Sequence, residues 1–266
     1  MYNNQRIIKE LKPYIPAADI FRIYKKEAGC AFLDSSLVND LGRYSIIGRA
    51  PYLKLVKDGD TFTVNGKPET GKTFEDYMRE YLNTHEDKNE CPLPIVSGAI
   101  GYFSYDYGRE QMGVPTGEKD LVTIPEAVLT FYDCFIVEDC REKRTYLVSN
   151  GITGNAPELI RSMEKEIQEN VKFGKISVSE AEKKITAPVS HREKFKIQVH
   201  PNFEKEEYKQ AVDRMIRYII EGDIYIANMT QQLTIESEKQ PLDVFYDLRK
   251  NNPSPFGGYM DFGDYQ

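Results

Sequence analysis

The stretch 202–232 constrains the fold most, because its hydrophobic period changes from that of a helix to that of a strand. In its first half, apolar residues recur at three- and four-residue steps, acidic residues gather in the first turn, and Gly222 stands where a helix cap is expected. From Ile224 onward the residues alternate, and one face ends in a polar row of Asn228, Thr230 and Gln232. We therefore expect a helix followed by a strand, with the polar row facing solvent or a pocket. The apolar stripe of the helix consists of Tyr208, Ala211, Val212, Met215, Ile216 and Ile219.

Length and charge limit the class of protein. A chain of 266 residues can form one large domain or two smaller ones. The net charge is −7, and no basic stripe interleaved with aromatic residues is present, which argues against a general nucleic-acid binder. The first residues lack a hydrophobic signal core, and no apolar run approaches the ~20 residues of a membrane helix. The 4 cysteines have no C-x-x-C pairing and the 3 histidines are scattered, so we expect a cytoplasmic protein without a zinc site.

Periodicity predicts the other elements by residue range. Helices are expected at 19–28, 74–82, 157–172 and 243–250, and strands at 30–35, 128–138 and 144–149, with a hairpin over 52–64. Thr73 is the expected cap of the second helix. Between 95 and 106 small residues alternate with bulky ones, which predicts the close approach of a neighbouring backbone or ligand. The polar, lysine-rich stretch 173–203 is expected to be a crossover or linker.

One stretch matches a known binding motif but is not expected to bind the motif's ligand. Residues 66–73 satisfy G-x-x-x-x-G-K-[ST], the pattern of a phosphate-binding loop. Such a loop follows a buried hydrophobic strand, whereas Gly66 follows Asn65 in the predicted turn of a hairpin. We therefore expect no nucleotide site and no binding of ATP at this loop.

Four motifs, in order along the chain, resemble those of one enzyme family. They are FLDS at 32–35 with GRYSIIG at 42–48, the glycine-rich stretch 98–110, GDIY with NMTQ within 222–231, and NPSPF with YMDF within 252–262. Together they are similar to the large subunits of anthranilate synthase and aminodeoxychorismate synthase. Asn228 and Thr230 look more like the aminodeoxychorismate branch, and anthranilate synthase component I is the alternative within the family.

The resemblance implies an α+β fold in which large antiparallel sheets pack against helices, here truncated. It divides the chain into an N-terminal region at 1–172, a linker or crossover at 173–203, and an incomplete start of the chorismate-binding domain at 204–266. The full enzyme would aminate chorismate with ammonia from a glutamine amidotransferase subunit, require Mg²⁺ and serve folate synthesis. The family's magnesium-binding glutamates and catalytic residues belong to motifs that this sequence lacks. We therefore assign no catalytic residue and no metal ligand, and expect the chain alone to be inactive.

The resemblance also implies a binding pocket. In the family, the first and last of these motifs face each other across a site for tryptophan. Hydroxyls and a carboxylate would receive the charged ends of such an amino acid, and main-chain groups would close over its indole. Asp34 stands where the family has the longer glutamate. The candidate residues are Leu33, Asp34, Ser35, Arg43, Tyr44, Ser45, Asn228, Pro255, Phe256 and Gly257.

Two alternative interpretations compete with the enzyme fragment and its amino-acid pocket. The candidate pocket residues could simply form turns at a domain interface. The chain as a whole could be a non-catalytic amino-acid-binding or subunit-docking module. The gene beyond codon 266 separates the last interpretation from an enzyme fragment, because continuation into catalytic motifs indicates an enzyme and a stop codon indicates a module.

Overall fold

A computed structural model describes residues 6–25, 27–114, 123–173 and 198–266. By their contacts the residues divide into two units, 1–182 together with 241–266, and 183–240. Most of the expected linker at 173–203 lies outside the described residues. No helix among the described residues is both long and apolar enough to span a membrane.

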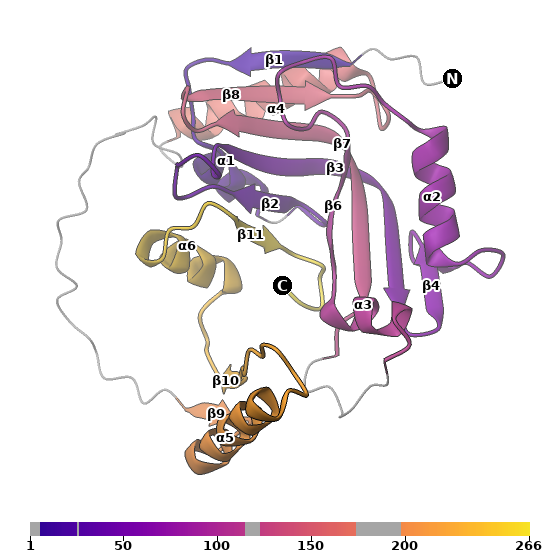
Figure 1. Cartoon of the computed structure of the whole chain (residues 1–266). Coiled ribbons are helices and arrows are strands. Elements are labelled where there is room, and N and C mark those ends of the chain that lie inside the picture. The colour runs from indigo at the N-terminus through magenta and orange to yellow at the C-terminus, as the bar shows by residue number, and fades with distance from the viewer. Residues whose placement is uncertain (1–5, 26, 115–122, 174–197) are drawn as a thin grey trace, which may run out of the picture. The chain divides into compact units, whose positions relative to one another are not determined.

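The first unit is built on a large antiparallel sheet (Figure 1). Along the sheet the order is β1 (Ile7–Leu11), β8 (Arg144–Ser149), β7 (Ala127–Asp139), β3 (Tyr44–Asp58), β2 (Ala31–Asp34) and β11 (Gly257–Met260). Each strand runs antiparallel to its neighbour. The hairpin strand β4 (Thr61–Val64) pairs with β3 and with β5 (Lys67–Pro68), and β6 (Gly98–Phe103) pairs with β7. The expected antiparallel α+β architecture is confirmed.

The two longest strands, β3 and β7, bend the sheet. β3 pairs with β2 near its start and with β4 near its end, and β7 likewise pairs with β6 and then with β8. A register shift between Pro51 and Leu53 and a positive φ of 51° at Ala50 mark the bend in β3. The sheet therefore changes direction where β3 and β7 each pass from one pairing strand to the next, as the course of these two strands in Figure 1 shows.

Alternation along the strands divides the core between the two faces of the sheet. On one face, Ile136 and Phe32 pack with residues of α1 (Ala17–Tyr24), α4 (Ala156–Lys172) and α6 (Pro241–Asn251). On the other face, Phe135 packs with the loop residues Leu93 and Val96. Helix α2 (Phe74–Thr84) covers the β3–β4 end, where Phe74 contacts Phe62 edge-on. The short α3 (Tyr105–Gln111) follows β6.

Local signals placed several of these boundaries correctly. The Thr73 side chain accepts the N–H of Asp76 and caps α2, as predicted. Asn65 and Gly66 have φ values of 50° and 75° in the turn between β4 and β5, so the phosphate-loop pattern begins in a hairpin turn. Lys72 of that pattern pairs with Glu80 of α2.

The second unit contains β9 (Val199–Pro201), α5 (Lys205–Glu221) and β10 (Leu233–Ile235). Helix α5 begins with a capping box between Glu204 and Glu207 and ends at Gly222, whose φ is 86°. The predicted helix is confirmed, but the strand predicted from Ile224 is wrong, since 224–232 is irregular and only the three residues of β10 pair with β9. Alternation alone does not make a strand, because a strand also needs a neighbour for its backbone groups.

The division by contacts differs from the expected range 204–266. Residues 241–266 belong with the first unit because β11 pairs with β2 and Phe245 of α6 contacts the ring of Phe32 edge-on. The part of the chain at 183–240 is thus inserted between α4 and α6 in sequence.

Candidate functional site

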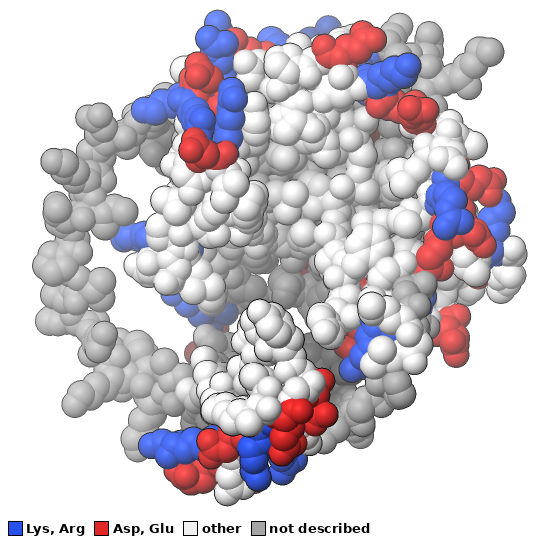
Figure 2. All heavy atoms as spheres, viewed as in Figure 1, with Lys and Arg blue, Asp and Glu red and all other residues white. Residues whose placement is uncertain are grey.

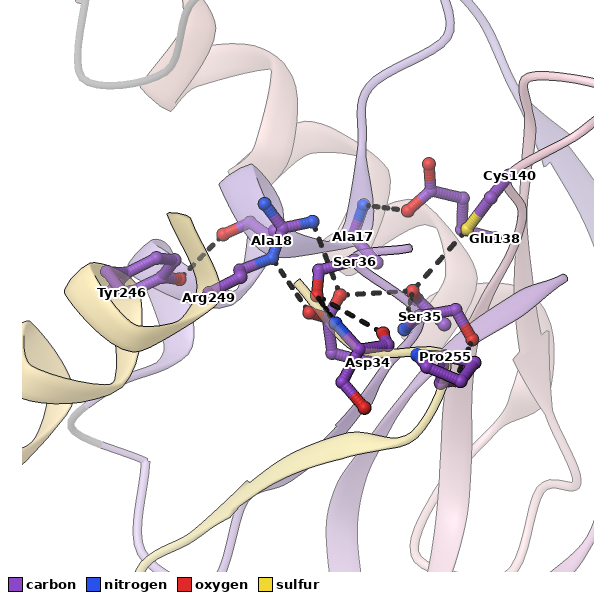
Figure 3. Close-up of polar contacts among 12 residues, drawn as sticks. Ala17, Ala18, Asp34, Ser35, Ser36, Glu138, Cys140, Tyr246, Arg249 and Pro255 are labelled. Atoms are coloured by element: carbon purple, nitrogen blue, oxygen red, sulfur yellow. Dashed lines mark hydrogen bonds and ion pairs between the residues drawn. The ribbon is translucent and has the colours of Figure 1, made fainter. Parts of the chain in front are cut away.

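Of the predicted pocket residues, Asp34, Ser35 and Pro255 lie close together where β2, β3 and β11 meet (Figure 3). Gly257 lies opposite Asp34 in the antiparallel register. The Ser35 hydroxyl lies 2.8 Å from the carbonyl oxygen of Tyr44 and 2.9 Å from that of Pro255. The Ser254 backbone N–H donates to the Ser36 hydroxyl at 2.9 Å. Two motifs separated by about 220 residues in sequence are therefore joined directly by hydrogen bonds.

Asp34 is the buried charge of this junction. Only 3% of the residue is exposed, and Arg249 of α6 donates to its two carboxylate oxygens at 2.8 Å and 3.3 Å. The Ser45 hydroxyl donates to the same carboxylate at 3.2 Å and accepts the N–H of Ser35 at 3.0 Å. A buried carboxylate requires such partners because its desolvation is costly. Arg249 therefore fixes α6 to the end of β2.

Arg249 is absent from the predicted set. Its sequence signal is a basic residue in the last turn of an amphipathic helix, immediately before the proline turn. In general, a cation there also interacts favourably with the helix dipole. Sequence alone therefore suggests that this arginine caps the helix, and does not suggest that it pairs with a carboxylate on a distant strand.

The remaining candidates have separate surroundings. Arg43 donates to Asp139 at 2.6 Å and 3.0 Å, and its guanidinium lies 4.9 Å from the centre of the Tyr44 ring. Burial alone would raise the pKa of Asp139, but the hydrogen bonds from Arg43 and from two backbone N–H groups lower it. Phe256 is 73% exposed. Leu33 pairs with Gly258, and Asn228 is an exposed residue of the second unit.

A second buried carboxylate, Glu138 of β7, lies beside this junction (Figure 3). It accepts the hydroxyl of Tyr14 and, at 2.8 Å, the N–H of Ala17 at the start of α1. Burial raises the pKa of Glu138, and the nearby Asp34 adds to that effect, although the hydrogen bonds oppose it. Burial likewise raises the pKa of the neighbouring Cys140 thiol to about 11, so this cysteine is protonated at neutral pH.

Glu138 gives the protein a testable pH dependence. Because the pKa is raised above its ordinary value of 4.5, the folded state binds this proton more tightly than the unfolded chain does. Its contribution to stability is therefore fully present below pH 4.5 and is lost as pH rises through the folded-state pKa. Glu138→Gln should gain stability relative to the unmodified protein as pH rises, in urea unfolding at several pH values. The exposed Glu90→Gln is the control, and parallel pH profiles for all three proteins would contradict the assignment.

The described residues offer no metal centre. Within them, no group of three or more His, Cys, Asp and Glu residues is arranged to hold an ion. Asp34 and Glu138 are buried and already have protein partners. The described part of the chain thus does not fit a magnesium site.

A hollow of about 780 Å³ opens at the other end of β11, away from Pro255. Its lining includes Tyr52, Lys54 and Phe262, with the Lys54 ammonium 5.5 Å from the centre of the Phe262 ring. This hollow was not predicted from the sequence, because its lining residues lie far apart in the chain: Lys54 belongs to β3, and Phe262 lies just beyond β11. None of the residues that line this hollow belongs to the predicted pocket.

Comparisons with known proteins agree with the fold. The family model described as chorismate binding enzyme matches residues 39–266. Anthranilate synthase component 1 of Acetivibrio thermocellus is 28% identical over 263 residues, covering 91% of this chain and 50% of the relative. Aminodeoxychorismate synthase component 1 of Bacillus subtilis is 25% identical over 229 residues, covering 85% of this chain and 47% of the relative.

A solved structure shows the same architecture. Anthranilate synthase component I from Streptococcus pneumoniae TIGR4 superposes with a TM-score of 0.59 at 19% identity, covering 82% of this chain and 47% of that one. The chain thus spans about half the length of the relatives that it matches. Since the family model covers well over half of its residues, the chain belongs to the chorismate-binding enzyme family.

Proposed function

We propose that this chain is part of an aminodeoxychorismate synthase component I, which aminates chorismate with ammonia from a glutamine amidotransferase subunit and requires Mg²⁺. The observation that supports this most is the family match over 39–266, which includes all the motifs from Gly42 onward. Asn228 and Thr230 favour this branch by their resemblance. The metal ligands and catalytic residues would lie outside this chain, so no catalytic step is assigned to its residues.

Anthranilate synthase component I is the second candidate. Relatives with that name, including those of Acetivibrio thermocellus and Saccharomyces cerevisiae at 28% identity, support it. Both candidates start from chorismate and differ in the amino product that is released.

Product identity decides between the candidates. We expect the isolated chain to form no product from chorismate, ammonia and Mg²⁺, since it carries no assigned catalytic residue. The complete reading frame, from its start to its own stop codon, should relieve a 4-aminobenzoate requirement in a bacterial strain that lacks aminodeoxychorismate synthase. Relief of a tryptophan requirement alone would favour the second candidate, and relief of neither would contradict the proposed enzyme class.

We further propose that the junction of β2 and β11 binds a tryptophan-type amino acid. Because Arg249 already neutralises Asp34, we expect the Ser35 hydroxyl and the main chain at 255–257 to supply the discriminating contacts. The exposed ring of Phe256 would cover part of the indole. Two or three charge-assisted hydrogen bonds in a half-buried site are compatible with micromolar affinity, about −8 kcal/mol.

Tryptophan emission measures this binding directly, since the protein contains 0 tryptophan residues. Titration with protein should shift the emission of free tryptophan and raise its anisotropy, and Ser35→Ala should weaken both effects. Ser36→Ala is the matched control, because Ser36 bonds the same turn through Ser254 and is not assigned to the pocket. Unchanged emission and anisotropy up to millimolar protein would leave a plain structural junction as the role of these residues.

A further inference from the structure

The hollow of about 780 Å³ has the size of a small-molecule site, since ligand pockets typically measure roughly 300–1,000 Å³. Its lining comes from the loop before β2, from β3 and β7, from the β4–β5 turn and from the segment after β11, all of them in the first unit. On the face of that unit seen in Figure 2, charged side chains lie mainly at the margins, and uncharged residues fill the middle, where Figure 1 places the end of the chain. Gln266 at that end belongs to the lining, so the hollow lies beside a mainly uncharged part of the surface.

Asn65 holds one wall of the hollow in place. Its side-chain oxygen accepts the Lys54 N–H at 2.7 Å, and its side-chain amide donates to the carbonyl oxygen of Tyr52 at 3.3 Å. The Asn65 backbone N–H donates to the carbonyl oxygen of Lys54 at 2.8 Å. The register shift between Pro51 and Leu53 lies in the same stretch of β3, and such bulges redirect side chains. Tyr52 and Lys54 therefore project from a backbone that is already fixed.

An aromatic cluster forms another wall. Phe262, which lines the hollow, stacks on Tyr265 with ring centres 5.0 Å apart, and Tyr102 of β6 contacts it edge-on at 5.6 Å. The hydroxyls of Tyr102 and Tyr265 are hydrogen-bonded at 2.8 Å. The position of the Phe262 ring is thus set by two neighbours that are themselves linked. An aromatic ring that enters the hollow can pack against it.

Lys54 has no acidic partner among the residues that the structure describes. Its ammonium lies 5.5 Å from the centre of the Phe262 ring, and no described carboxylate forms an ion pair with it. The two acidic residues of the lining are already engaged, since Glu27 lies 2.6 Å from Arg49 and Asp261 accepts a backbone N–H at 2.9 Å. Lys54 is half-buried, where water and salt screen a charge less than at the open surface. The hollow therefore favours an anion beside Lys54.

We propose that this hollow binds a small aromatic carboxylate, with its ring against Tyr52 and Phe262 and its carboxylate at the Lys54 ammonium. Fixed aromatic side chains favour a flat apolar partner, and a few placed polar groups give a pocket its selectivity. A hydrogen bond from an ammonium to a carboxylate is charge-assisted, so it also orients the ligand. The proposal depends neither on the branch of the family nor on the tryptophan-type pocket.

A fluorescent aromatic carboxylate tests the class of ligand. Titration of 2-naphthoate with the chain should raise the anisotropy of its emission. 2-Naphthamide has the same ring without the charge, and it should bind about tenfold more weakly or worse, because it cannot form the ion pair with Lys54. Equal binding of the two compounds would overturn the proposal, and so would unchanged anisotropy of 2-naphthoate up to millimolar protein.

Charge variants test the position of the carboxylate. Lys54→Met should weaken 2-naphthoate binding by about tenfold or more and leave 2-naphthamide binding almost unchanged. The methionine keeps an apolar stem, and the bonds to Asn65 use only the backbone of residue 54. Lys67→Met is the matched control, because Lys67 is an exposed lysine of the same hairpin outside the lining, and it should change affinity by less than about twofold. Equal weakening by the two substitutions would show a general attraction to positive charge and overturn the site.

One further variant separates this site from the tryptophan-type pocket. Ser35→Ala, which alters that pocket, should change 2-naphthoate binding by less than about twofold, because Ser35 does not line the hollow. Loss of 2-naphthoate binding in Ser35→Ala would place the compound at the junction of β2 and β11 and overturn the proposal. Failure of tryptophan to bind would leave the hollow unaffected, so the two proposals fail by different results.

Discussion

Replacing Gly101 with alanine should destabilise the protein by about 3 kcal/mol or more, the upper range for inserting a methyl group where no room exists. Gly101 of β6 lies opposite Leu129 of β7. A Cβ atom built at Gly101 would stand 1.8 Å from the carbonyl oxygen of Val128, so the two strands must separate to admit it. The expected result is a lower urea midpoint with loss of the β6–β7 hydrogen bonds, measured by unfolding and by amide exchange.

Gly108→Ala is the control for this substitution. Gly108 lies within α3, and a Cβ atom there meets nothing within 4 Å. Alanine favours the helical conformation over glycine by about 1 kcal/mol, so this change should be neutral or slightly stabilising. A loss of stability in Gly101→Ala that does not exceed the change in Gly108→Ala would show that β6 can move away from β7 at little cost.

The same region shows what sequence can predict. The alternation of small and bulky residues over 95–106 predicted a close backbone approach, and Gly101 against Val128 provides it. Caps were predicted equally well at Thr73 and Gly222, because capping is a local matter of one side chain or one φ angle. Such features depend on neighbours a few residues away, which the sequence displays directly.

Features that need a distant partner were predicted less well. The alternating residues from Ile224 resemble a strand, but among the described residues only Leu233–Ile235 finds a partner there. Periodicity describes the face that a strand would present and does not say whether a neighbour exists. The contact division places 241–266 with the first unit because β11 pairs with β2, and this pairing is a long-range contact.

In the candidate site, one contact was predicted from the sequence and another was not. The resemblance placed Ser35 and Pro255 together, and the structure joins them by a hydrogen bond of 2.9 Å. The charges were harder to predict. Asp34 was expected to receive a ligand's ammonium group, whereas Arg249 supplies a cation from within the protein. The role of Asp34 toward a ligand stays a prediction, and its role in holding α6 is visible.

Arg249→Met should destabilise the protein by about 3 kcal/mol, near the lower end of the cost of breaking a buried ion pair. The methionine keeps the packing of the long side chain but leaves the Asp34 carboxylate, with its side chain 2% exposed, without its cation. The estimate is at the lower end because the Arg249 side chain is 32% exposed and Ser45 still donates to the carboxylate. Urea unfolding at neutral pH measures the change.

Two companion variants separate the buried charge from the loss of a surface arginine. Arg79→Met breaks a pair with Asp76 whose side chains are 69% and 60% exposed, and it should cost less than about 1 kcal/mol. Adding Asp34→Asn to Arg249→Met removes the uncompensated charge and should recover most of the lost stability. If the double variant is as unstable as Arg249→Met alone, the loss comes from the packing of α6. Recovery would mean that the loss comes from leaving the buried Asp34 carboxylate without its cation, and not from the packing of α6.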